Sequence, residues 1–165
     1  MKIFLIGFMG CGKTTLGKKL AKHLNYNFID LDSYIEKKTN KTITEIFENK
    51  GEKKFRIVEK ESLTEVCKKD NFVIATGGGT PCFFDNMQKI LDSGKVIYLK
   101  KEIEDLLGRL EKEKRQRPLI KNKSAKELES FIRNKLSERE CFYKKSNYIL
   151  QGKSICEKEI QNLIF

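Results

Sequence analysis

The chain has 165 residues, the size of one domain, and a domain of this size buries about 70% of its extended-chain surface. Its net charge of +11 permits nucleic-acid binding but equally suits an enzyme whose two substrates are both anions. No apolar run approaches the ~20 residues needed to cross a bilayer, and the five cysteines show neither C-x-x-C pairs nor regular spacing, which argues against a disulfide framework or a zinc site. Because Met1 leads directly into the first motif, we expect no signal peptide and a soluble, cytoplasmic protein.

The first motif follows a short apolar strand predicted over residues 2–6. Gly7 to Thr14 spell GxxxxGK[ST], and a helix with apolar residues at helical spacing begins at Thr14. Glycines let such a loop turn its N–H groups inward, and the helix offers its positive N-terminal end to phosphates. In this motif Lys13 reaches the β- and γ-phosphates, and the hydroxyl of Thr14 ligates Mg²⁺. The sequence therefore predicts binding of a nucleoside triphosphate.

We expect the phosphates to be held by six consecutive residues: Gly10, Cys11, Gly12, Lys13, Thr14 and Thr15. Cys11 has two interpretations. A thiol at a helix N-terminus can have a lowered pKa and react, or Cys11 is simply a small residue that fits the loop.

Strands and helices alternate along the rest of the chain. Further strands are predicted over residues 27–32, 71–76, 95–99 and 147–151, and helices over residues 53–68, 84–93, 106–110, 124–143 and at the C-terminal end. Apolar strands separated by helices are typical of a parallel sheet covered on both faces, with functional groups at the carboxyl ends of the strands. Three motifs fall at such ends: the phosphate loop, Asp30-Leu31-Asp32 and Gly77-Gly78-Gly79. The sequence thus predicts an α/β fold in three layers, with a five-stranded parallel sheet flanked by helices.

The two aspartates Asp30 and Asp32 are candidates for acid–base and metal chemistry. Two residues apart in an extended segment, they would point to the same side and face one cleft beside the phosphate loop. One carboxylate could orient Mg²⁺ through its waters, and the other could grip or deprotonate a hydroxyl acceptor. The alternative is that Asp32 only caps a helix over residues 33–38.

Arginine is scarce in this chain, since 28 of the 34 basic residues are lysines. The six arginines are Arg56, Arg109, Arg115, Arg117, Arg133 and Arg139. Each is therefore a candidate for a position that needs a planar, bidentate donor.

Several segments together resemble the shikimate kinase family in their order and spacing. They are the loop from Gly7 to Gly17, Phe28-Ile-Asp-Leu-Asp32, Ile46-Phe47, Gly51-Glu52-Lys-Lys-Phe55-Arg56-Ile-Val-Glu59, Gly77-Gly-Gly79, Arg117-Pro118-Leu119, and Arg139 with Tyr143. The resemblance spans nearly the whole chain. It implies a P-loop fold of the nucleoside-monophosphate-kinase type in one domain, residues 1–165, with a mobile lid at about 111–122 and a substrate-binding segment at about 32–60.

The resemblance also implies a reaction, the transfer of the γ-phosphoryl group of ATP to the 3-hydroxyl of shikimate with Mg²⁺ as cofactor. On the ATP side, Lys13 and Arg117 would be catalytic, Arg109 would lie against adenine, and Thr14 and Asp30 would hold the metal. Because Thr76 stands where an aspartate of the metal shell is usual, the rest of that shell stays open.

On the acceptor side, the resemblance makes Asp32 the residue that holds the ring hydroxyls and acts as base. The other implied roles are a carboxylate clamp of Arg56 and Arg139, backbone contacts to the ring from Gly78 and Gly79, and pocket walls of Phe47 and Phe55. The implied partners are small molecules only, with no nucleic acid and no membrane, and a monomer would suffice.

Alternatives remain for several of these residues. Arg115 competes with Arg117 for the lid role, and Arg109 could be a solvated helix charge. The run from Glu111 to Arg117 could be only an exposed helix end with alternating charges. Phe47 and Phe55 could be ordinary core residues. Two other functions also remain: a gluconate or nucleoside monophosphate kinase on the same fold, and a basic nucleic-acid-binding NTPase.

Overall fold

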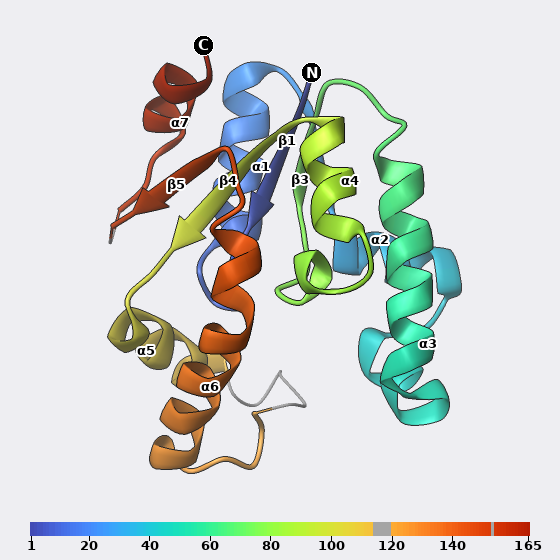
Figure 1. Cartoon of the computed structure of the whole chain (residues 1–165), viewed down its shortest axis with the longest axis vertical. Helices are drawn as coiled ribbons and strands as arrows, with labels where there is room; N and C mark the ends of the chain where they lie inside the picture. Colours follow the sequence, from blue (N-terminus) through green and yellow to red (C-terminus); the bar gives the residue numbers. More distant parts are fainter. Residues whose placement is uncertain (114–119, 153) are drawn as a thin grey trace.

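The computed structural model describes residues 1–113, 120–152 and 154–165. Within them the chain forms a parallel sheet of five strands in the order β2-β3-β1-β4-β5 (Figure 1). The strands are β1 (Lys2–Ile6), β2 (Asn27–Asp30), β3 (Phe72–Ala75), β4 (Lys95–Lys100) and β5 (Tyr148–Gln151). The helices are α1 (Lys13–Leu24), α2 (Leu31–Thr39), α3 (Ile43–Val66), α4 (Asn86–Ser93), α5 (Ile103–Glu113), α6 (Ala125–Tyr143) and α7 (Glu157–Ile164), with a short 3₁₀ turn η1 (Thr80–Cys82).

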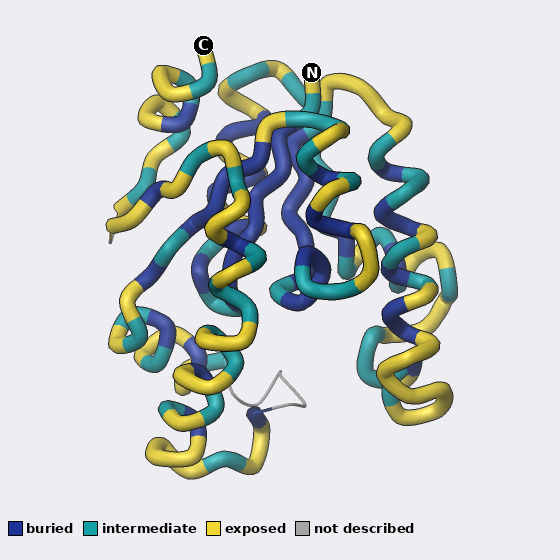
Figure 2. Tube along the Cα trace, in the orientation of Figure 1, coloured by how far each residue is buried: buried dark blue, intermediate teal, exposed yellow. Residues whose placement is uncertain are grey.

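The three central strands β3, β1 and β4 are buried on both faces of the sheet, which makes three layers. Along the central strand β1, Ile3 and Leu5 pack into one apolar cluster with α1 and α7, whereas Phe4 and Ile6 pack into a second cluster with α2, α3 and α4. Successive strand residues point to opposite faces, so a strand covered on both sides must be continuously apolar. Figure 2 shows the result, with buried strands inside and the exposed residues on the outer sides of the helices. The predicted fold class is confirmed.

The parallel arrangement brings the carboxyl ends of the strands to one edge of the sheet. β1 pairs with β3 on one side and with β4 on the other, and β2 pairs with β3. The segments that follow β1, β2 and β3 therefore lie next to one another, as the sequence predicted. The two chain termini lie at the opposite end (Figure 1).

Two differences from the predicted helix boundaries bear on the site. The second strand ends at Asp30, and Asp32 lies in the first turn of α2, so the argument that both aspartates belong to an extended segment is wrong. The helix starts here because the Asp30 side chain accepts a hydrogen bond from the Ser33 backbone N–H at 3.3 Å. The cap is therefore Asp30 and not Asp32.

The other difference is α3, which begins ten residues before the predicted helix at residue 53. Thr42 and Glu45 form a reciprocal capping box that starts it at Ile43. Gly51, with φ 73° and ψ 169°, interrupts the helical backbone and kinks α3 between the two halves. No helix in the described part of the chain is long and apolar enough to span a membrane.

Candidate functional site

The phosphate loop connects β1 to α1 through three glycines with positive φ. Gly7, Gly10 and Gly12 have φ values of 139°, 78° and 97°, a region that side chains with a Cβ rarely adopt. Gly12 is the N-cap of α1 and offers no side chain to its first N–H groups. Those N–H groups have no partner within the helix, which makes this end of α1 suited to an anion.

Lys13 is largely buried at the centre of this loop. Its Nζ donates hydrogen bonds to the carbonyls of Gly7 at 2.8 Å and Phe8 at 2.9 Å, and lies 3.6 Å from the Cys11 Sγ. The ammonium is thus held inside the loop by backbone oxygens. A triphosphate bound in the loop would offer this charge stronger, anionic acceptors.

Thr14 and Asp30 form an oxygen pair beside the loop. The Thr14 hydroxyl donates to Asp30 Oδ2 at 2.7 Å, while Asp30 Oδ1 caps α2. Mg²⁺ takes oxygen ligands and is usually bound by one or two carboxylates together with waters and substrate phosphates. A hydroxyl and a carboxylate next to a phosphate loop fit that donor set. Among the described residues no group of three His, Cys, Asp or Glu side chains forms a ready-made metal site.

Asp32 faces the same cavity as Lys13. The cavity has a volume of about 260 Å³ and is lined by Met9, Gly10, Gly12, Lys13, Thr14, Thr15, Asp30, Asp32, Thr76, Gly77, Gly78, Arg109 and Glu113. Burial, followed by the neighbouring carboxylates of Asp30 and Glu59, raises the pKa of Asp32 to about 6, although Lys13 opposes the shift. A carboxylate with this pKa can accept a proton near neutral pH.

The turn Gly77-Gly78-Gly79 follows β3, and its first two glycines line this cavity. A Cβ on Gly77 would lie 2.9 Å from Asp32 Oδ1, one on Gly78 would lie 3.5 Å from Arg139 Nη1, and one on Gly79 would lie 2.7 Å from Arg56 Nη2. At Gly77 and Gly79 these distances are shorter than a side chain tolerates. These two positions need glycine because Asp32 packs against the backbone at Gly77 and Arg56 packs against it at Gly79.

Arg56 is buried, with 8% of its surface exposed, between two carboxylates of its own helix. Its Nη1 donates to Glu59 Oε2 at 2.9 Å, and its Nε and Nη2 share Glu52 Oε1 at 3.3 and 3.1 Å. Glu59 is itself buried and accepts a second hydrogen bond, from the Thr80 hydroxyl at 2.7 Å. Glu59 therefore fixes Arg56 and the turn after β3 in one network.

Arg139 reaches the glycine turn from the last part of α6. Its guanidinium lies 5.7 Å from the centre of the Phe8 ring, and one turn later Tyr143 donates its hydroxyl proton to the carbonyl of Gly78 at 2.5 Å. The Arg-x-x-x-Tyr spacing of the sequence thus places both side chains on the same side of α6 and against the same turn.

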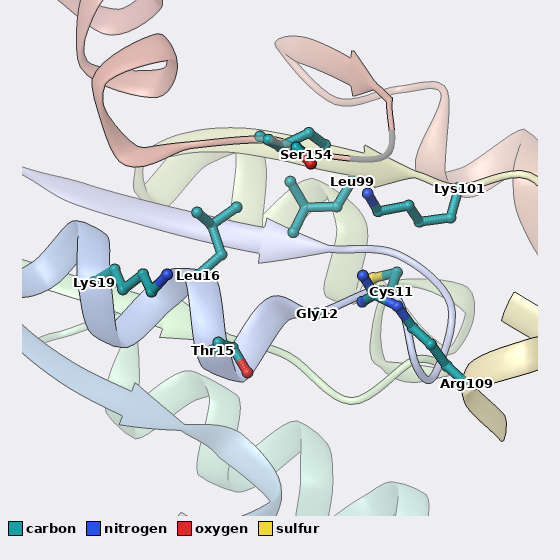
Figure 3. Close-up of a pocket in the computed structure, with 10 residues that line it drawn as sticks. Cys11, Gly12, Thr15, Leu16, Lys19, Leu99, Lys101, Arg109 and Ser154 are labelled. Atoms are coloured by element: carbon teal, nitrogen blue, oxygen red, sulfur yellow. The ribbon is translucent and has the colours of Figure 1, made fainter. Parts of the chain in front are cut away.

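A second cavity lies on the other side of the phosphate loop, with a volume of about 170 Å³ (Figure 3). It is lined by Cys11, Gly12, Thr15, Leu16, Lys19, Leu99, Lys101, Arg109, Ser154 and Ile155. Arg109 comes from α5 and donates to the carbonyl of Gly10 at 3.3 Å. Lys101 is buried and donates to the carbonyl of Gly152. The cavity combines apolar walls with cations and adjoins the phosphate loop.

Other predicted residues lie elsewhere or outside the described part. The rings of Phe47 and Phe55 pack 4.6 Å apart in the apolar cluster under α2 and α3. Arg133 pairs with Glu129 on the surface of α6 at 2.8 Å. Arg115 and Arg117, the two candidates for the lid, lie outside the described residues.

Glu59 is the residue that sequence reasoning missed, because it stood in the Gly51–Glu59 motif without a role. The available signal was its spacing, since residues three apart on a helix are neighbours and an acidic residue there can pair with Arg56. The second bond to Thr80 joins segments far apart in the sequence, and no local pattern predicts it.

We expect Glu59→Ala to destabilise the fold by about 3 kcal/mol, because it leaves the buried Arg56 charge without its buried partner. Urea unfolding measures this free energy. Glu61→Ala, an exposed change on the same helix, is the control and should alter stability by less than about 0.5 kcal/mol. Equal effects of the two variants would refute the structural role of Glu59.

Fold and site together define a kinase of the P-loop class: a parallel sheet, a phosphate loop after its central strand, and a carboxylate and arginines facing that loop. The family model described as shikimate kinase matches residues 9–164. The chain belongs to the shikimate kinase family.

Individual relatives agree over nearly the full length. The shikimate kinase of Azobacteroides pseudotrichonymphae is 48% identical over 165 residues, covering 99% of this chain and 97% of the relative. That of Parabacteroides distasonis is 44% identical, covering 98% and 94%. Among solved structures, shikimate kinase from Bacteroides thetaiotaomicron superposes with a TM-score of 0.92 at 43% identity, covering 99% and 96%. A shikimate kinase from Acinetobacter baumannii in complex with shikimate gives 0.88 at 35% identity, covering 99% and 89%.

Proposed function

We propose that the protein transfers the γ-phosphoryl group of ATP to the 3-hydroxyl of shikimate, giving shikimate 3-phosphate and ADP. The observation that carries this is the glycine turn, where Asp32, Arg56 and Arg139 meet beside the cavity that contains Lys13. One carboxylate and two guanidinium groups suit a hydroxylated monocarboxylate. The solved complex of a relative with shikimate adds support.

On the phosphate side, Lys13 neutralises the charge that develops on the transferred group. The carbonyls of Gly7 and Phe8 hold its ammonium group in the loop, where it would meet the β- and γ-phosphates of bound ATP. Thr14 and Asp30 would hold Mg²⁺, which supplies further charge neutralisation between the phosphates. The adenine would occupy the second cavity, with Arg109 against it and Leu16 and Ile155 as apolar walls.

On the acceptor side, Arg56 and Arg139 hold the carboxylate, and this orients the ring across the glycine turn. Asp32 then accepts a hydrogen bond from the reacting hydroxyl and takes its proton as the oxygen attacks phosphorus. Phosphoryl transfer asks the protein mainly to position the reactants, which is what a rigid turn with three packed side chains provides. The role of Arg117 rests on the family resemblance. Phe55 would support the pocket through its contact with Arg56, and Phe47 would do so through its packing on Phe55.

Every side chain named in this proposal comes from one chain, so a monomer suffices. The use of ATP fits the cytoplasmic location expected from the sequence.

Replacing Glu52 is expected to strengthen, not weaken, the binding of shikimate. Its carboxylate occupies the Nε–Nη2 edge of Arg56, the edge that binds carboxylates with two donors, and it is 57% exposed. The substrate carboxylate must displace it. We expect Glu52→Gln to lower the KM for shikimate by about two- to fivefold, because an exposed ion pair contributes no more than about 1 kcal/mol. Steady-state kinetics measures this, with Glu48→Gln, an exposed change in the first half of α3, as control. A KM that rises would show that Glu52 helps binding.

The proposed function is tested by an acceptor panel in a coupled assay of ADP release with ATP and Mg²⁺. We expect shikimate to support turnover, and AMP and gluconate to leave the rate at its background. Activity on AMP or gluconate without activity on shikimate would reverse the assignment. Stimulation of ATP hydrolysis by RNA or DNA would instead favour a nucleic-acid-dependent NTPase.

A further inference from the structure

The guanidinium group of Arg56 lies over the aromatic ring of Phe83, in addition to its ion pairs with Glu52 and Glu59. The Arg56 Cζ lies 4.0 Å from the centre of the Phe83 ring, compared with 5.1 Å from the ring of Phe55. A cation at this distance over an aromatic ring is attracted by the negative face of the ring, and the attraction is stronger where water is excluded. Arg56 is 8% exposed, so this stack lies in a largely dry environment.

The stack adds a constraint that the ion pairs lack. Glu52 and Glu59 hold the edges of the guanidinium, and the backbone of Gly79 lies so close that a Cβ there would be 3.1 Å from the Cζ. Hydrogen bonds at the edges alone would let the plane of the guanidinium group tilt about those bonds. A ring lying against the face opposes that tilt and so fixes the plane of the guanidinium.

The chain holds Phe83 in this position through the residues that follow it. Phe84 adopts φ 52°, uncommon for a bulky residue, and its exposed ring lies 5.0 Å from Lys60 Nζ. Lys60 also pairs with Asp85 at 2.7 Å, and Asn86 Nδ2 donates to the carbonyl of Thr80 at 2.9 Å. These contacts tie the segment to α3 and to η1 on both sides of Phe83.

We propose that Phe83 is a positioning residue for acceptor binding: it fixes the plane of Arg56 so that the Nε–Nη2 edge meets the substrate carboxylate. This inference rests on the proposed function and deepens it. Selectivity for a carboxylate then depends on an aromatic residue that does not itself touch the substrate.

Kinetics of Phe83→Leu test the proposal, since leucine keeps the apolar bulk and removes the ring. We expect the KM for shikimate to rise by about 3- to 30-fold, the range of a partly buried cation–π contact, while kcat and the KM for ATP stay within about twofold. Phe83→Tyr keeps an aromatic face and should restore the wild-type KM. Phe165→Leu makes the same exchange at an exposed ring at the other end of the chain and should leave both KM values unchanged.

A second readout separates positioning from loss of structure. An acceptor in which the carboxylate is reduced to a primary alcohol cannot use Arg56, so wild type and Phe83→Leu should have the same kcat/KM for it. Phe83→Met, a flexible side chain without a ring, replaces Phe83→Leu if the latter does not fold.

Three results would overturn the proposal: an unchanged KM for shikimate in Phe83→Leu, equal rises in the KM for shikimate and ATP, or the same loss with the alcohol analogue. Wild-type protein that fails to phosphorylate shikimate would refute the proposed function itself, and this inference with it. Wild-type turnover with an unaffected Phe83→Leu variant would refute the inference alone.

Discussion

Lys13→Met is expected to reduce kcat by about 10²- to 10³-fold or more, because it removes a preorganised cation aimed at the charge that develops during transfer. Lys13 is held in the loop by the carbonyls of Gly7 and Phe8, so its ammonium is in place before ATP arrives. Methionine has a similar length without the charge. The measurement is single-turnover kinetics at saturating ATP and shikimate, which isolates transfer from product release.

The control for this variant is Lys18→Met, an exposed lysine on the same helix. It should leave kcat within about twofold, since surface charges away from the site contribute little. Circular dichroism should show both variants folded. A Lys13→Met enzyme with wild-type kcat would remove Lys13 from the mechanism and reopen the assignment of the loop.

Asp32 is expected to control both the rate and its pH dependence. Asp32→Asn keeps the shape and removes the proton acceptor, so kcat should fall by about 10²- to 10⁴-fold. In the wild type, the pKa of about 6 means that the carboxylate is ionised above pH 6 and protonated below it. Since the reaction needs the ionised form, log kcat/KM for shikimate should be level above pH 7 and fall by about one unit per pH unit below 6.

The causes of the raised pKa of Asp32 suggest a control experiment. Burial is its main source, and the carboxylates of Asp30 and Glu59 add to it, so Asp30→Asn should move the break to lower pH. A wild-type profile without a break between pH 5 and 7, on protein shown to be folded over that range, would contradict the role of Asp32 as base.

The fold could be predicted from the sequence because its signals are local. Continuously apolar runs such as residues 3–6 and 96–99 are typical of strands that are buried on both faces, and the loop from Gly7 to Thr14 fixes the order of strand, loop and helix. Helix boundaries were less predictable. The hydrogen bond from Ser33 to Asp30 ends β2 two residues early, and aspartate supports either a strand end or a cap.

The site was only partly predictable, because its contacts join distant segments. That Asp32, Arg56 and Arg139 meet at the glycine turn follows from the order of the strands together with the family resemblance. The bond from Thr80 to Glu59 and the stack of Phe83 on Arg56 depend on how α3 packs against the segment after β3. A buried glutamate and an aromatic residue in a loop have no signature in sequence that separates these roles from ordinary packing.

The central claim is that one crevice brings the triphosphate of ATP to a hydroxyl of shikimate. Phosphorus NMR of the protein with ATP, Mg²⁺ and shikimate tests it directly, since it follows the fate of the γ-phosphoryl group. We predict that the γ signal is replaced by ADP and one phosphate monoester, only when shikimate is present. Conversion of ATP to ADP and inorganic phosphate at a rate independent of shikimate would contradict the claim.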